Sequence, residues 1–161
     1  MTSSSLLLRP FSGTDSEFFA TLASDERVVR FIGYGKPWNQ QDIDACIVSA
    51  LQHDDLNQVG ASRWFVASMA GQAVGVVFST RQENSIEIGY WVSPAHWGRG
   101  VGGTMLDQTL VMVPELFGLT TLSAGVAPGN TISAKLLTKR GFTLTVHTDQ
   151  LDHYVLSPQS N

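Results

Sequence analysis

Two kinds of hydrophobic spacing succeed each other along the chain. Apolar residues recur at roughly three- and four-residue intervals over residues 15–31 and 41–56, which predicts two helices. Residues 63–92 instead carry aromatic and β-branched side chains in short runs separated by turns, which is typical of strands. These runs are predicted to form an antiparallel meander of three strands, over residues 63–69, 73–80 and 86–92.

Further elements are predicted on both sides of this meander. Leu6-Leu7-Leu8 favours a short first strand that Pro10 ends. After the meander we expect a helix over 102–113, a strand over 119–126, a helix over 131–140 and a closing hairpin over 142–146 and 154–156. Pro114 is expected to kink or end the helix over 102–113. Asn130 is expected to cap the helix over 131–140, and Gly141 to end it. This order predicts an α/β fold, with a mixed, mostly antiparallel central sheet flanked by about four helices.

Composition narrows the class of protein. The 161 residues suit one domain over 1–161, because domains cluster near ~100–150 residues. A net charge of −4 argues against general nucleic-acid binding, which needs clustered Lys and Arg. No apolar run approaches the ~18 residues of a membrane helix, and the start lacks the basic region of a signal peptide. Cys46 is the single cysteine, which fits a reducing cytoplasm, and no metal site is expected.

The glycines are unevenly distributed. Four of them fall within the six residues Gly98-Arg99-Gly100-Val101-Gly102-Gly103, between a predicted strand and a predicted helix. Glycine lets the backbone take a positive φ and approach a ligand closely, and a helix N-terminus offers free N–H groups and partial positive charge. The cluster therefore indicates an anion site, most often for phosphate, and the alternative is a tight turn with close helix–sheet packing.

Two common phosphate motifs fit this cluster poorly. The string matches G-x-G-x-x-G, the fingerprint of a dinucleotide-binding fold. Such a fold has an acidic residue about 20 positions after the motif, and residues 119–126 contain none. Residues 98–104 also imitate G-x-x-x-x-G-K-[ST], but the lysine that would contact a nucleotide triphosphate is missing. Neither class is favoured.

A third match extends along most of the chain. The segment Pro94-Ala95-His96-Trp97-Gly98-Arg99-Gly100-Val101-Gly102 resembles the pyrophosphate loop of the GNAT N-acetyltransferase superfamily, in the W-G-[KR]-G form of its RimJ/RimL-like branch. Further segments are similar in the same order, namely Leu6–Pro10, Lys36-Pro37-Trp38, Glu87-Ile88-Gly89-Tyr90-Trp91-Val92, Asn130-x-x-Ser133 and Lys139-x-Gly141-Phe142. The chain departs from the family in Gly103, in Pro114 and in residues 143–146, which lack an acid often found there.

The resemblance implies a fold and a cofactor. In this family a bulge splays two central strands apart, and the pantetheine of acetyl-CoA lies between them. Backbone groups of Trp91 and Val92 would pair with pantetheine, and N–H groups from Trp97 to Gly103 would hold the pyrophosphate. Arg99 either adds charge there or is a solvated loop cation, and Asn130 contacts pantetheine or caps its helix. Lys139 and Arg140 either meet the 3′-phosphate or complement their helix end. The implied cofactor-binding set is Trp91, Val92, Trp97, Gly98, Arg99, Gly100, Val101, Gly102, Gly103, Thr104, Asn130 and Lys139.

The family transfers acetyl to a primary amine by direct attack, which requires a proton acceptor. An ammonium group with a pKa of about 8 to 10.4 must lose a proton before it attacks, and a carboxylate can take that proton through water. Glu87 is the first candidate base, unless it is an outward-facing strand glutamate, and His153 is the second. Ser133 on the first turn of its helix is expected to protonate the leaving thiolate, with Tyr154 as the alternative.

The acceptor is expected to bind between the first two helices, the loop between them and the last hairpin. Tyr34, Trp38 and Trp64 would line the pocket or pack in the core, and Asp42 and Asp44 would attract an amine or stabilise a first helical turn. The acceptor is a small-molecule amine or a protein N-terminus, and the family suggests a homodimer. Two other functions remain open at this point, a non-catalytic or weakly catalytic acyl-CoA-binding or sensing module, and an interaction protein with a decayed site.

Overall fold

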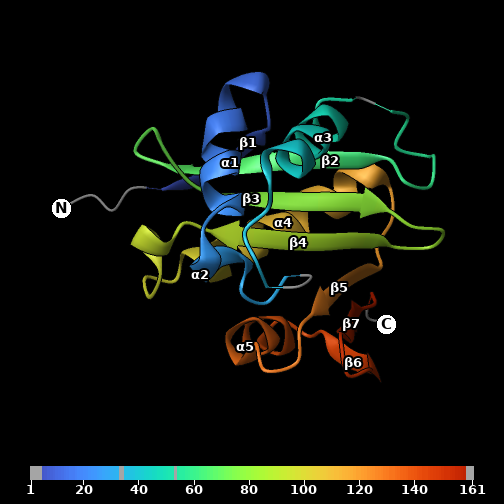
Figure 1. The fold of residues 1–161 in the computed structure, drawn as a ribbon. Coiled ribbons are helices and arrows are strands. Elements are labelled where there is room, and N and C mark those ends of the chain that lie inside the picture. The colour runs from blue at the N-terminus through green and yellow to red at the C-terminus, as the bar shows by residue number, and fades with distance from the viewer. Residues whose placement is uncertain (1–4, 33–34, 53, 159–161) are drawn as a thin grey trace.

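One seven-stranded sheet organises the computed structural model, which describes residues 5–32, 35–52 and 54–158 (Figure 1). Its strand order is β1-β2-β3-β4-β5-β7-β6, and every neighbouring pair is antiparallel except β4 and β5. The strands are β1 (Leu6–Pro10), β2 (Ser62–Met69), β3 (Gln72–Arg81), β4 (Ile86–Val92), β5 (Leu122–Val126), β6 (Thr143–His147) and β7 (Asp152–Leu156). The predicted mixed sheet is thus confirmed.

Helices cover both faces of the sheet. In Figure 1, α1 (Ser16–Ala23), α2 (Glu26–Val29) and α3 (Gln40–Ala50) lie in front of the sheet, and α4 (Val101–Phe117) lies behind it. The helix α5 (Thr131–Lys139) lies beside β5 and contributes Leu137 to the same core as α4. Two short 3₁₀ helices, η1 (Gly13–Asp15) and η2 (Pro94–His96), complete the described elements.

A separate apolar core lies on each face. The α4 face buries aliphatic side chains such as Met105 and Leu106 against the strands, and the front face buries Phe19, Ile43 and Val66. Because successive side chains of a strand point to opposite faces, each central strand serves both cores. The described residues contain no helix long and apolar enough to cross a membrane and no cluster of metal-ligating side chains.

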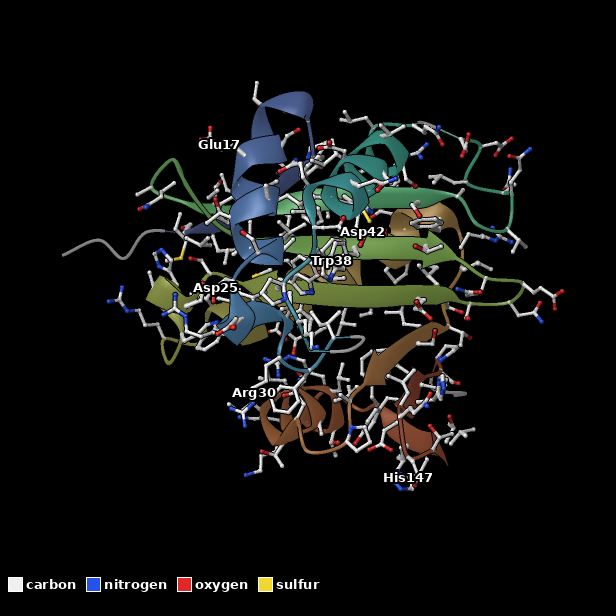
Figure 2. All side chains as sticks on the ribbon, in the orientation of Figure 1. Glu17, Asp25, Arg30, Trp38, Asp42 and His147 are labelled. Carbon is white, nitrogen blue, oxygen red and sulfur yellow. The ribbon has the colours of Figure 1, made fainter. Side chains whose placement is uncertain are left out.

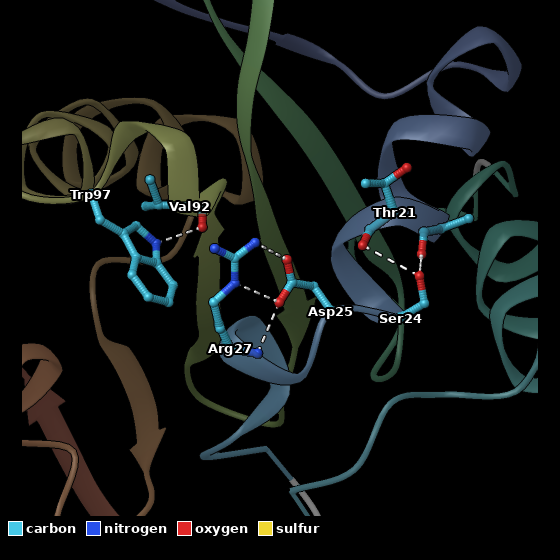
Figure 3. A network of polar contacts seen from close by, with 7 residues as sticks. Thr21, Ser24, Asp25, Arg27, Val92 and Trp97 are labelled. Atoms are coloured by element: carbon cyan, nitrogen blue, oxygen red, sulfur yellow. Dashed lines mark hydrogen bonds and ion pairs between the residues drawn. The ribbon is translucent and has the colours of Figure 1, made fainter.

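Three helix boundaries differ from the sequence-based expectation. The predicted helix over 15–31 is two helices, because the Asp25 carboxylate accepts the Arg27 N–H at 2.8 Å and starts a new helix there (Figure 3). The helix predicted over 41–56 ends at Ala50. Pro114 lies inside α4, which continues to the buried Phe117 and ends at Gly118, because burial of its apolar face outweighs the one backbone bond that proline removes.

The central strands β4 and β5 separate after a short contact. They pair only at Ile86↔Leu122 and Glu87↔Ser123, although both strands continue for several residues. The predicted splay is therefore present. The expected bulge is not its cause, since the β3–β4 register runs without a shift from Gly75↔Val92 to Arg81↔Ile86. The opening instead arises where β5 leaves β4, just beyond Glu87.

Candidate functional site

The glycine-rich loop begins the long helix α4 beside the end of β4. Gly98 and Gly100 have φ values of 77° and 76°, a left-handed region in which any other residue is strained. A Cβ at either position would meet no atom within 4 Å. These two glycines are therefore required by the backbone angle, and the space in front of the loop is open.

The loop presents a row of backbone donors. The N–H groups of residues 98–103 make no hydrogen bond to any of the described residues. The Trp97 N–H is already used, since it donates to the Pro94 carbonyl at 3.2 Å, and Thr104 donates both its N–H and its hydroxyl to the Gly100 carbonyl at 3.1 Å. Six successive donors at the positive end of a 17-residue helix fit an anion with several oxygens, as a diphosphate has.

Trp97 fastens this loop to the sheet. Its indole Nε1 donates to the Val92 carbonyl at 2.8 Å, and 48% of its surface is exposed (Figure 3). Arg99 is also exposed and lies beside Gly100 and Thr104 at a small hollow. The structure therefore gives Trp97 a positioning role for the loop and leaves Arg99 as a cation close to the row of donors.

Every second residue of β4 directs its backbone N–H and C=O groups toward the opening. Ser93 N–H bonds to Val74 on β3 at 2.8 Å, whereas Ile86 N–H bonds to Thr121 on the other side at 3.0 Å. Because backbone groups alternate along an antiparallel ladder, Tyr90 and Val92 present theirs to the opening, while those of Trp91 face β3. Of the two residues expected to pair with a ligand in the opening, only Val92 has its backbone directed there.

The Trp91 side chain belongs to an aromatic cluster under α1 and α3. It stacks on Phe19 with ring centroids 5.4 Å apart, and Phe78 and Trp38 lie 5.0 and 5.4 Å away. Trp64 joins the same cluster through Phe78 at 4.7 Å. Trp38 and Trp64 are thus partly buried and pack against the core of the front face, neither lines the cavity beside Glu87, and Figure 2 shows Trp38 over the middle of the sheet. Tyr34, expected with them, lies outside the described residues.

Tyr90 and Ser133 meet on the opposite face of the opening. The Tyr90 hydroxyl donates to Ser133 Oγ at 3.3 Å, so the proton of Ser133 stays available for another acceptor. Burial raises the pKa of the Tyr90 hydroxyl, against smaller opposing effects of the Ser133 contact and the Arg140 charge. Tyr90 therefore remains protonated at neutral pH. Tyr154, the expected alternative, is 8% exposed within the core of the α4 face.

The segment around α5 holds the first turns of α4 in place. Asn130 caps α5 by accepting the Ser133 N–H at 3.4 Å, as predicted. Arg140 donates to Asp107 at 2.7 Å and to the Gly103 carbonyl at 3.1 Å, so it joins α5 to the start of α4. A Cβ at Gly103 would come within 2.8 Å of Arg140 Nη2, so a larger residue there would displace the Arg140 guanidinium. Lys139 is exposed beside Arg140.

Glu87 lies on the face of the sheet that carries α1–α3. Its side chain is exposed in a cavity of about 300 Å³, which begins where β4 and β5 part. The lining residues are Phe78, Thr80, Glu87, Ile88, Gly89, Gly125 and Leu151. His153 is opposite Gly125 on β7, exposed and outside this lining. Of the two expected bases, the cavity contains Glu87.

Local hydrogen bonds surround the start of α3. Asp42 lies in the first turn, where its backbone N–H donates to the capping Asn39 side chain at 2.8 Å, and Asp44 accepts a hydrogen bond from Gln40 Nε2 at 2.7 Å. Figure 2 shows Asp42 on α3, and neither acid lines the cavity beside Glu87. The position of Asp42 agrees with stabilisation of the helix start.

Several residues of this site were not predicted from the sequence. They are Tyr90, which contacts Ser133, and the cavity residues Phe78, Thr80, Ile88, Gly89, Gly125 and Leu151. Tyr90 stands two positions before Val92 in a strand already singled out, and its alternation with Trp91 gave the only signal. Gly125 and Leu151 have no pattern of their own, because only the pairing of β5 with β7 brings them to the cavity.

Comparisons with known proteins identify the family and agree with the fold. A family model described as an acetyltransferase (GNAT) domain matches residues 5–143. The uncharacterized N-acetyltransferase YoaA of Bacillus subtilis (strain 168) is 26% identical over 143 residues, covering 85% of this chain and 78% of that protein. The spermidine N-acetyltransferase of Vibrio cholerae, solved in complex with CoA and spermine, has a TM-score of 0.79 at 20% identity and covers 94% of each chain. An acetyltransferase of Agrobacterium tumefaciens str. C58 also has a TM-score of 0.79, at 18% identity, covering 98% of this chain and 94% of that one.

Proposed function

This chain belongs to the GNAT acetyltransferase domain family, and from that premise we propose that it transfers the acetyl group of acetyl-CoA to a primary amine. The observation that carries the proposal is the row of six N–H donors at residues 98–103, which have no partner among the described residues, beside an opening in the sheet with Glu87 at its closed end. A site for a diphosphate and a candidate base thus lie toward the two ends of one opening between strands.

The residues around the opening fit the cofactor. Backbone donors of Gly98 to Gly103 would hold the pyrophosphate, and the Val92 and Tyr90 backbones would face pantetheine. Exposed Arg99 and Lys139 supply positive charge for phosphate groups, since Arg140 is occupied by Asp107. When bound, acetyl-CoA supplies the acetyl group and a thiolate leaving group.

Glu87 is the proposed base. Its carboxylate, directly or through one water, accepts a proton from the acceptor ammonium, so that the neutral amine nitrogen can form the new N–C bond as the C–S bond breaks. The nitrogen then releases its second proton to water as the amide forms. Its place in the cavity supports this role over His153, which lies outside the lining. An alkylammonium has a pKa of about 10.4 in water, so a base is needed at neutral pH.

Ser133 is the proposed proton donor to the thiolate, and Tyr90 is its positioning residue. Because the Tyr90 hydroxyl donates to Ser133 Oγ, the remaining Ser133 proton is directed away from Tyr90. The pair lies on the α4 face of the sheet, whereas Glu87 lies on the other face, since Tyr90 and Glu87 alternate along β4. Proton removal and proton delivery are thereby separated.

Replacing Tyr90 by phenylalanine is expected to lower kcat by about three- to tenfold, the effect of one hydrogen bond. Ser133→Ala should lower kcat at least as much, and the double variant no more than Ser133→Ala alone, because Tyr90 acts through Ser133. Steady-state kinetics and calorimetric acetyl-CoA binding separate kcat from affinity. Additive losses, or a parallel loss of acetyl-CoA affinity, would contradict the positioning role.

Acetyl-CoA binding and acetyl transfer test the function as a whole. Acetyl-CoA at 100 times its Kd should stabilise the fold by about 2.7 kcal/mol, visible as a rise in Tm. Two measurements then test transfer: the release of CoA thiol in the presence of amines, and mass spectrometry of the acetylated amine. Stabilisation without transfer to any amine would favour the acyl-CoA-sensing alternative, and no stabilisation would reject the use of acetyl-CoA.

Finer assignments accompany this proposal. The Trp97-Gly98-Arg99-Gly100 loop supports the RimJ/RimL-like branch, in which the acceptor is a small-molecule amine or a protein N-terminus. The single Cys46 supports a cytoplasmic enzyme, and we take residues 1–161 as one acetyltransferase domain. A homodimer remains a prediction from the family, for sedimentation to test.

A further inference from the structure

We propose that the cavity beside Glu87 receives the acceptor and selects a small primary amine with one positive charge and an apolar body, in preference to a polyamine. The inference rests on the proposed function and goes beyond it by naming the acceptor class. Three properties of the lining carry it: its place, its charge and its shape.

The cavity lies at the point where an acceptor must meet the opening. Its lining comes from β3, β4 and β5 and from Leu151, just before β7. Glu87 and Ser123 form the last pair before β4 and β5 separate, and Gly89 in the lining lies just beyond them. Gly102 of the glycine-rich loop lies against the Tyr90 side chain, which is on the other face of the sheet. The cavity is therefore reached from the side opposite the loop.

The cavity offers one charge and no more. Glu87 is the only titratable side chain among the described lining residues. Two charged groups adjacent in sequence to lining residues have other partners, since Asp152 of β7 pairs with His147 and the Arg81 guanidinium of β3 donates to the carbonyls of Leu56 and Gln82. A second ammonium would lie against apolar side chains without a counter-charge, which is costly.

The walls of the cavity are apolar and held in place. Phe78 is fixed within the aromatic cluster, with ring centroids 4.7 Å from Trp64 and 5.0 Å from Trp91. Across from it, Leu151 packs over Gly125, where a Cβ would come within 3.0 Å of Leu151 Cδ2. Thr148 accepts the Leu151 N–H at 2.9 Å and donates to its carbonyl at 2.8 Å, which fixes the turn.

Size and wall chemistry together define the ligand. A volume of about 300 Å³ is at the lower end of small-molecule sites, which run from about 300 to 1,000 Å³. A primary amine placed at Glu87 would therefore have its carbon skeleton against Phe78 and Leu151. Such an amine buries apolar surface on both walls, whereas an extended polyamine would bring further charges onto them.

The test compares 2-phenylethylamine, spermidine and a short peptide with a free N-terminus in wild type, Leu151→Glu and the matched control Leu151→Gln. Wild type should acetylate 2-phenylethylamine with a kcat/KM at least about tenfold above that of the other two. Leu151→Glu adds a second carboxylate and should shift the ratio toward spermidine about tenfold, while Leu151→Gln, equally polar but uncharged, should not. Equal Tm shifts with CoA in all three proteins establish that the variants fold.

Calorimetric binding of 2-phenylethylamine and of spermidine to the CoA-loaded protein tests the inference independently of turnover. Tighter binding of 2-phenylethylamine, weakened in Leu151→Glu, supports the pocket even if no amine is acetylated, in which case the proposed transfer alone has failed. Preference for spermidine or for the peptide, or an amine preference identical in all three proteins, would overturn the inference while leaving acetyl transfer intact.

Discussion

Glu87→Gln is expected to lower kcat for an accepted amine by about 10²- to 10³-fold, the range of a lost general base. The amide keeps the shape of the carboxylate but cannot accept the ammonium proton, and the cavity that holds Glu87 has no other titratable side chain among its described residues. Affinity for acetyl-CoA should change less than about twofold, because the loop donors lie in the loop and first turn of α4, outside the cavity that holds Glu87.

The pH dependence of this loss separates a base from a structural glutamate. The free-amine fraction of an alkylamine rises about tenfold per pH unit below its pKa of about 10.4, so the variant should regain activity steeply between pH 7 and 9.5. Wild type should rise less over the same range, and the ratio of the two rates should shrink. Steady-state kcat measured across this range is the readout.

Two matched variants complete the Glu87 experiment. Glu83→Gln makes the same chemical change on an exposed residue of the β3–β4 turn, outside the cavity, and should leave kcat near the wild-type value. His153→Gln removes the alternative base. If His153→Gln carries the pH-dependent loss and Glu87→Gln does not, the assignment of the base is wrong.

Gly100→Val is expected to weaken acetyl-CoA binding by about 10- to 100-fold. Valine at a φ of 76° costs about 1–2 kcal/mol, and relief of that strain turns the neighbouring N–H groups out of their common direction. Its side chain would also enter the open space in front of the loop. Calorimetric titration with CoA measures the loss directly.

Gly118→Val provides the matched control for the loop. Gly118 ends the same helix with a φ of 70°, and a Cβ there also meets nothing within 4 Å, but it lies at the opposite end of α4. The control should lose a similar amount of stability in chemical unfolding and keep its affinity for CoA. Equal affinity losses in both variants would show that general destabilisation, and not the loop donors, explains the effect.

Local patterns predicted several elements well, because the side-chain alternation of a strand and the capping of a helix are set by residues a few positions apart. The strand Ile86–Val92 has the predicted bounds, and Asn130 caps α5 through the Ser133 N–H as expected. The prediction of one helix over 15–31 was wrong for a local reason as well. The Asp25 side chain accepts the Arg27 N–H and caps a second helix there. At Pro114 a distant cause prevailed, since burial of the α4 face in the sheet core keeps the helix intact.

The sequence by itself was sufficient for the type of fold and for the glycine-rich loop at the start of α4, because hydrophobic period and clustered glycines act over a few neighbouring residues. Only the tertiary structure decided which groups face the opening between β4 and β5. Strand pairing directs the Val92 backbone into the opening and turns that of Trp91 to β3, and it brings Tyr90 to Ser133 and Leu151 over Gly125. These contacts join residues far apart in the chain, so their geometry follows from the register and packing of the whole sheet rather than from any local pattern.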